Sequence, residues 1–156
     1  MRRTDKEIKD PEIISRIISM CQVCRLGLAK DNIPYIVPVS FGYDGSALYI
    51  HTATTGRKIE FFEANPNICI EFEHDVHVKA HESMPCNWSF SYQSVISYGV
   101  IRELSEPTEI IAALKLIMRT YSEKDWSFSE ADIASIRVWK ISIDSLTGKN
   151  SKRKID

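Results

Sequence analysis

Apolar and polar positions along the chain follow two different periods. A helical period begins after Asp10 and Pro11, which suit the N-cap and first turn of a helix, and another follows Pro107. Shorter helices are expected from Gly56 to just before Asn65, and near residues 130–133. Six further stretches alternate or are rich in β-branched and aromatic residues, which is typical of strands. They are 23–29, 35–45, 47–53, 67–74, 89–104 and 135–146.

Six strands with few helices between them predict a mainly β protein of the α+β class. The Asp44-Gly45 pair indicates a tight hairpin turn, and Pro38 predicts an edge strand or a bulge. Residues 75–87 are polar and are interpreted as irregular chain. The expected architecture is a small six-stranded antiparallel β-barrel with peripheral helices, not a parallel doubly wound sheet.

Composition adds limits on size, partners and compartment. The 156 residues suit a single domain, taken as 1–150, followed by a basic tail at 151–156 that we expect to be disordered. A formal charge of -1 gives no field that would attract nucleic acid or an anionic membrane. Apolar runs are too short to span a bilayer, and no signal peptide is evident. Four irregularly spaced cysteines favour a reducing cytoplasm over a disulfide framework.

The stretch "HTATTGRKIEFFEANP", residues 51–66, carries the main chemical signal. Arg57 and Lys58 follow Gly56 at a helix start, where the helix dipole disfavours cations. An anion between these cations and the free N–H groups of the helix removes that conflict. Arginine binds phosphate in a bidentate manner and lysine acts as a point charge, so phosphate is the expected anion. No glycine-rich nucleotide cradle is present, which leaves FMN in a barrel as the leading ligand; solvated surface cations are the alternative.

These residues resemble a known family. The 51–66 stretch, followed by "PCNWSFSYQSVISYGVIREL" and a closing "TGK", is similar to the pyridoxamine phosphate oxidase-related flavin-binding split barrels, and most similar to their nitroimidazole-resistance branch. The resemblance implies a homodimer with a flavin in each groove between subunits. It also implies cofactor contacts from Val39, Ser40, His51, Thr52, Ala53, Arg57, Lys58, Trp88, Gln93 and Ser94. An arginine-rich C-terminal substrate motif is missing, so oxidation of vitamin B6 is not expected.

Three other groups of residues carry possible chemistry. His51 is the candidate catalytic residue, because its pKa suits proton donation or substrate positioning near neutral pH. Cys21 and Cys24 form a C-x-x-C pair without a second pair, which favours buried apolar thiols over zinc or redox chemistry. The segment with His74, His77 and His81 lacks a helical stripe, so a solvated loop near the dimer interface is preferred to a metal site.

The sequence therefore predicts a flavin-dependent oxidoreductase that reduces nitroaromatic, nitroimidazole-like acceptors with electrons from a reduced nicotinamide or another donor. A quinone is the alternative acceptor. A barrel that stores or senses flavin or haem without rapid turnover is the alternative from a different class. FMN is the expected cofactor, FAD also suits the same phosphate clamp, and deazaflavin is a further alternative.

Overall fold

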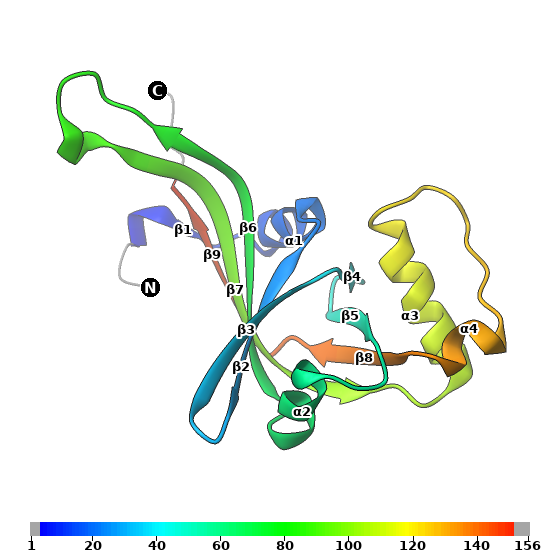
Figure 1. The fold of residues 1–156 in the computed structure, drawn as a ribbon. Helices are drawn as coiled ribbons and strands as arrows, with labels where there is room; N and C mark the ends of the chain where they lie inside the picture. The colour runs from blue at the N-terminus through cyan, green and yellow to red at the C-terminus, as the bar shows by residue number, and fades with distance from the viewer. Residues whose placement is uncertain (1–3, 152–156) are drawn as a thin grey trace.

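The computed structural model describes residues 4–151 as an open antiparallel sheet with helices around it (Figure 1). Four α-helices are described: α1 (Pro11–Met20), α2 (Arg57–Ala64), α3 (Pro107–Arg119) and α4 (Glu130–Ala134). Two single turns of 3₁₀-helix, η1 (Thr4–Lys6) and η2 (Pro85–Asn87), accompany them. The strands are β1 (Glu7–Ile8), β2 (Cys24–Lys30), β3 (Ile33–Val39), β4 (Gly42–Tyr43), β5 (Ala47–Thr52), β6 (Asn67–Lys79), β7 (Ser89–Glu103), β8 (Arg137–Ser142) and β9 (Ser145–Asn150).

The strand order β3-β2-β6-β7-β8-β5-β4 confirms the mainly β, α+β split barrel. The sheet is not closed, because the described path ends at β3 on one side and β4 on the other. Each of the six predicted stretches overlaps a strand of this path: β2, β3, β5, β6, β7 and β8. The strands β5, β7 and β8 lie wholly within their stretches, whereas β2, β3 and β6 extend beyond theirs. The two-residue strands β1 and β4 and the strand β9 were not separately predicted. Pro38 lies on β3, at the edge that its missing N–H predicts.

Strand β7 joins the two halves of the split barrel. Along one edge it pairs with β9 over Gln93–Tyr98, and then with β8 over Ile101–Glu103. The predicted single strand 135–146 is therefore wrong, since the chain turns between β8 and β9. Gly99 lies at this change of partner, where a Cβ atom would be only 1.8 Å from the carbonyl oxygen of Ser142. A glycine is required for that close approach.

Local sequence signals explain where the helices begin. The Asp10 carboxylate accepts a hydrogen bond from the N–H of Glu12 at 2.9 Å, with Pro11 in the first turn of α1. Helix α3 also begins with a proline, Pro107. Helix α4 begins with a capping box between Ser129 and Asp132. No helix within residues 4–151 is long and apolar enough to cross a membrane.

Two apolar clusters hold these elements together. The larger one fills the barrel between α1, α2 and the strands, and Phe41 and Phe72 meet edge to face in it at 5.3 Å. The smaller one packs α3 against β8 through Leu114, Ile117 and Val138. Burial of these side chains on both faces of the sheet provides most of the driving force for folding.

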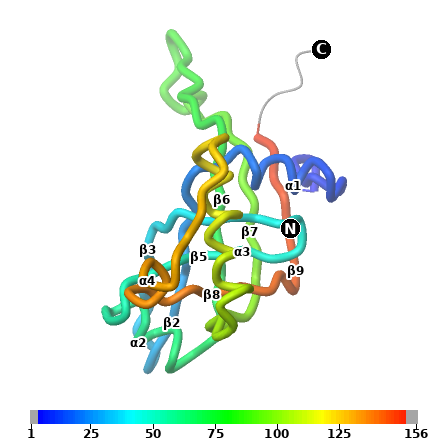
Figure 2. The backbone as a smooth tube through the Cα atoms, turned by 90° about the vertical axis from the view of Figure 1, so that its right-hand side faces the viewer, coloured from blue at the N-terminus to red at the C-terminus, as the bar shows by residue number. Residues whose placement is uncertain are grey.

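The hairpin of β6 and β7 extends beyond the barrel as a two-stranded arm, which we define as residues 74–93 (Figures 1 and 2). Strand β6 continues to Lys79, so the prediction of irregular chain from residue 75 is wrong for this part of it. A bulge at His74–His77 includes Asp75 with φ 57°.

The end of the described chain packs against the base of this arm. Ser151 was predicted to start the basic tail, but it is buried, and its hydroxyl accepts from the N–H of Tyr92 at 2.9 Å. The same hydroxyl donates to the carbonyl of Phe90 at 3.0 Å. The rest of the predicted tail, residues 152–156, lies outside the described residues.

Candidate functional site

The start of α2 presents two cations, Arg57 and Lys58, and one acidic residue, Glu60, in the same first turn. Gly56 is the N-cap with φ 136°, and no side chain caps the first N–H groups of the helix. Neither Arg57 nor Lys58 makes an ion pair with another described residue. By contrast, Arg25 is paired with Glu71 at 3.0 Å. Uncapped N–H groups, the positive end of the helix dipole and two unpaired cations together favour an anion here.

Helix α2 is fixed by its apolar face and by its C-terminus. Phe62 meets Trp139 of β8 edge to face at 5.1 Å, and Ile59 and Phe61 are buried beside it. The Asn65 side chain donates to the carbonyl of Ala29 on β2 at 3.1 Å. The helix therefore bridges both halves of the barrel, and the cations at its start have a fixed place on the fold.

Electrostatic links on the outer side of α2 strengthen this attachment. The guanidinium of Arg137 donates to Glu63 on α2 at 2.8 Å and to both carboxylate oxygens of Glu103 on β7. It also lies 4.6 Å from the centre of the Trp139 ring. One arginine thus connects α2, β7 and β8.

The guanidinium of Arg57 lies over two aromatic rings. Its guanidinium carbon lies 5.0 Å from the centre of the Tyr35 ring and 5.8 Å from that of Phe61. The two rings themselves are 5.1 Å apart. Tyr35 was not among the predicted site residues, because its place in the alternating pattern of the second predicted strand indicates only a core position.

His51 lies at the end of β5, close enough to Lys58 for the two to interact electrostatically. Burial of the imidazole first, and the charge of Lys58 second, lower the pKa of His51 below its ordinary value of 6.5. The ring is therefore neutral at pH 7, with one nitrogen that donates and one that accepts. His51 and its neighbour Ala53 both belong to the solvent-exposed residues.

The other predicted contacts on β3 and β5 divide between surface and core. Ser40 is exposed just after β3, but the side chain of Val39 is buried in the larger cluster. Thr52 is buried too: its hydroxyl accepts from the indole N–H of Trp139 at 3.0 Å and donates to the carbonyl of Ala53 at 2.8 Å. Because its hydroxyl is engaged inside the fold, Thr52 supplies structure rather than a free donor.

Trp88, Gln93 and Ser94 lie away from α2 in a single copy of the chain. Trp88 is 55% exposed at the tip of the arm, where its indole N–H donates to the carbonyl of His81 at 2.8 Å. Gln93 and Ser94 lie at the base of the arm, between β6 and β9. The arm projects from the end of the molecule opposite α2 in both views (Figures 1 and 2). One copy therefore does not bring these residues to the cations of α2.

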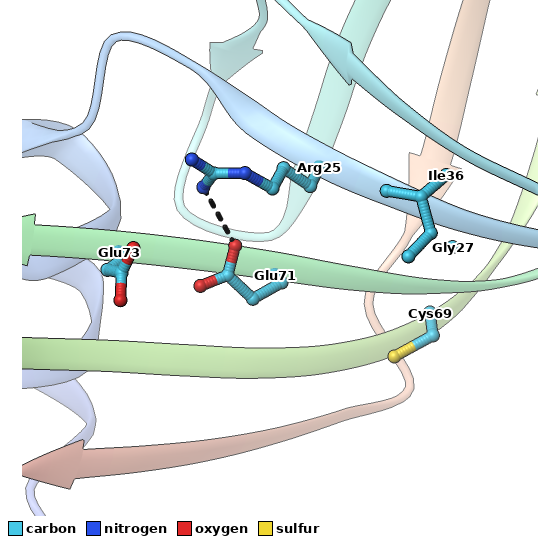
Figure 3. A pocket seen from close by; sticks show the side chains of 6 residues that line it. All are labelled: Arg25, Gly27, Ile36, Cys69, Glu71 and Glu73. Carbon is cyan, nitrogen blue, oxygen red and sulfur yellow. Dashed lines mark hydrogen bonds and ion pairs between the residues drawn. The ribbon is translucent and has the colours of Figure 1, made fainter.

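The hollow shown in Figure 3 lies on a different surface from the start of α2. This cavity of about 410 Å³ is lined by Arg25, Gly27, Ile36, Cys69, Glu71 and Glu73. Ile36 follows Tyr35 on β3, and side chains alternate between the faces of a strand. The hollow therefore opens on the face of β3 opposite to the one that carries Tyr35 and Arg57.

The remaining candidate groups show no assembled centre. All four cysteines are free thiols, and Cys21 and Cys24 are buried, which raises their pKa values to about 11 and about 12. His77 pairs with Asp75, while His81 accepts from the N–H of Met84 at 3.2 Å. Within residues 4–151 no group of three or more His, Cys, Asp or Glu side chains has a geometry that could hold a metal ion.

Comparison with protein families gives a match over most of the chain. The sequence model of the pyridoxamine 5'-phosphate oxidase family matches residues 10–150. The chain belongs to the pyridoxamine 5'-phosphate oxidase family. The match confirms the family recognised from the sequence, and the open antiparallel sheet confirms the split-barrel fold.

Solved structures with a similar fold include a candidate resistance protein, a flavocytochrome and an FAD and haem binding protein. A candidate 5-nitroimidazole antibiotic resistance protein from Bacteroides thetaiotaomicron is 32% identical, with a TM-score of 0.82 over 92% of this chain and 85% of that chain. A flavocytochrome of Azotobacter vinelandii has a TM-score of 0.84 at 20% identity, over 98% of this chain and 72% of that one. An FAD and haem binding protein of Mycobacterium smegmatis has a TM-score of 0.83 at 19% identity, over 97% of this chain and 76% of that one. The likeness to the last two shows the fold alone.

One curated relative matches over a short stretch. An uncharacterized protein of Rhizobium meliloti is 29% identical over 55 residues, which are 35% of this chain. The match spans 36% of the length of that relative, about a third.

Proposed function

We propose that the protein is a flavin-dependent oxidoreductase that binds FMN by its phosphate at the start of α2. The observation that carries the proposal is the unpaired Arg57 and Lys58 beside the uncapped N–H groups that follow Gly56. Arginine suits a bidentate contact with phosphate, lysine adds a point charge, and the helix dipole has the right sign. The donor set thus fits the phosphate end of a flavin. FAD presents a phosphate to the same donors and is the alternative cofactor.

When bound, the flavin supplies hydride or electron transfer, and the chain supplies binding and orientation. Arg57 and Lys58 hold the phosphate. His51, neutral at pH 7 because its pKa is lowered, donates or accepts one hydrogen bond to position the acceptor or the flavin ring. A reduced nicotinamide is the proposed electron donor.

A small nitroaromatic compound of the nitroimidazole type is the proposed acceptor. The 32% identity with the Bacteroides protein, over most of both chains, supports this class. A quinone is the alternative acceptor. Turnover of a reduced nicotinamide with each acceptor in turn separates the two: faster oxidation with the nitroaromatic supports the proposal, and turnover with quinones alone contradicts it.

We propose further that two copies pair, with a flavin at each interface. The support is an exposed apolar surface along the sheet and the arm. Ile36 is 69% exposed, Tyr98 58% and Phe90 55%. Ile36, Gly27, Cys69 and Tyr98 lie opposite one another on four neighbouring strands, so the side chains of Ile36 and Tyr98 lie on the same face of the sheet. Large exposed apolar surfaces mark interaction sites. A second copy would bring Trp88, Gln93 and Ser94 toward a flavin that they do not reach within one copy.

Flavin affinity tests the phosphate clamp directly. In the double variant Arg57→Ala, Lys58→Ala we expect the Kd for FMN to rise by at least about tenfold, because hydrogen bonds to charged groups contribute about 1.5–3 kcal/mol each. The control is Lys9→Ala, Arg16→Ala, which removes the same charge from exposed positions before and on α1. An unchanged Kd in the α2 variant, or an equal change in the control, contradicts the clamp.

A further inference from the structure

The aromatic surface beneath Arg57 is built from two elements. Tyr35 comes from β3 and Phe61 from the second turn of α2, and their rings meet at 5.1 Å with 48° between the planes. Phe61 is buried and Tyr35 is half-buried, so both rings are held by the core. The guanidinium carbon of Arg57 lies within 6 Å of both ring centres, the range in which a cation is attracted to an aromatic face.

This arrangement orients the guanidinium without neutralising it. A free arginine side chain has about 2 kcal/mol of rotamer entropy, part of which is lost when it binds a ligand. A carboxylate partner would reduce that loss, but it would also compete with an anionic ligand. Aromatic rings restrict the side chain and leave its charge and its N–H groups unpaired. Arg57 has aromatic support without an ion pair, whereas Arg25 is paired with a glutamate. Arg137 also lies over an aromatic ring, but two glutamates neutralise its charge.

We propose that Tyr35 and Phe61 form an aromatic seat that positions Arg57 for the phosphate of the flavin, so that Tyr35 sets the preference for phosphorylated over unphosphorylated flavin. The inference rests on the flavin-binding function proposed above and deepens it. Tyr35 is a positioning residue, since it acts through Arg57. The seat therefore affects FMN, which carries the phosphate, and leaves riboflavin, which lacks it, unaffected.

The test measures the Kd values of FMN and riboflavin by quenching of flavin fluorescence. In Tyr35→Leu we expect the preference for FMN over riboflavin to fall by about two- to fivefold, the loss of one exposed cation–π contact, with riboflavin affinity unchanged. Tyr35→Phe retains the ring, so it retains the full preference. In an Arg57→Ala background the same Tyr35→Leu change has no effect on either ligand.

Each other outcome has a distinct meaning. If the wild-type protein binds FMN and riboflavin equally well, the phosphate clamp itself is wrong. If the wild type prefers FMN and Tyr35→Leu keeps that preference, the clamp stands and the aromatic seat is overturned. Equal weakening of both ligands assigns Tyr35 a structural role and also overturns the seat. Thermal unfolding confirms that each variant is folded, and Phe61→Leu provides the second variant if Tyr35→Leu does not fold.

Discussion

Replacement of Gly99 by alanine tests how the two halves of the barrel are joined. The added Cβ would lie 1.8 Å from the carbonyl oxygen of Ser142 and 3.0 Å from its carbonyl carbon. Contacts below 3.0 Å essentially never occur for a Cβ atom, so the two backbones must separate by at least 1.2 Å. The same junction is held by a hydrogen bond from the N–H of Asp144 to the carbonyl of Tyr98 at 2.9 Å.

The cost follows from what has to move. Overpacking of a core costs about 1–3 kcal/mol when side chains can adjust, and more when they cannot. At Gly99 the obstacle is backbone on a paired strand, so we expect a loss of about 3 kcal/mol or more. With a urea m-value of roughly 2 kcal/mol/M, that loss lowers the unfolding midpoint by about 1.5 M.

Equilibrium unfolding in urea, followed by circular dichroism, measures this loss. Gly27→Ala is a matched control in the middle of β2, because its Cβ would meet the nearest atom at 3.4 Å, an ordinary contact. We expect the control to stay within about 0.5 kcal/mol of the wild type. A Gly99→Ala protein within about 1 kcal/mol of the wild type would refute the close approach of β7 and the β8–β9 turn.

Three further predictions concern charge and thiols. Arg137→Met should lower the free energy of unfolding by about 1–2 kcal/mol, measured in urea, because the lost contacts are charged but partly exposed. Arg137 also lowers the pKa of Glu103 below 4.5, so this carboxylate stabilises the fold above about pH 4.5 and the contribution is lost as the pH falls through the lower, folded-state pKa. Glu103→Gln should therefore make acid unfolding, followed by circular dichroism, less steep below that pH. Exposed Cys86 should react with a thiol reagent at pH 8 long before buried Cys21 and Cys24, whose pKa values are raised.

Each of these three predictions can be contradicted by a specific result. An Arg137→Met protein as stable as the wild type would mean that the link between α2 and the two strands contributes nothing. Identical acid-unfolding curves for Glu103→Gln and the wild type would remove Glu103 from the account of acid stability. Rapid reaction of all four thiols without denaturant would contradict the burial of Cys21 and Cys24. The total number of reactive thiols is measured separately on the protein unfolded in guanidinium chloride.

Much of the fold could be predicted because its signals are local. Asp10 caps the start of α1 next to Pro11 in its first turn. Gly56 and Asn65 are the N-cap and the C-cap of α2. Strand β7 was predicted almost to its ends because β-branched and aromatic residues run through its whole length. The start of α2 could be proposed as an anion site for a local reason too, since a cation pair at a helix start conflicts with the helix dipole.

The remaining features depend on contacts between distant parts of the chain. The β6 side of the arm was not predicted because residues 75–87 are mostly polar, and the alternation of Val76 and Val78 with polar neighbours covers only a few residues. The turn between β8 and β9 is set by Gly99 on β7, more than forty residues earlier in the sequence. The resemblance implied a cofactor contact from Thr52, and nothing in the sequence indicates that Trp139 from β8 donates to its hydroxyl. Tyr35 acquires its role only when α2 places Arg57 over its ring.

The most direct test of the central claim is the visible absorption spectrum of the protein purified without added cofactor, followed by mass analysis of what heat releases. The account predicts flavin absorption bands and the mass of FMN, and a mass of FAD would retain the phosphate clamp with the alternative cofactor. A haem Soret band without flavin would contradict the flavin assignment. A colourless protein that also fails to bind added FMN would show that Arg57 and Lys58 are ordinary surface cations.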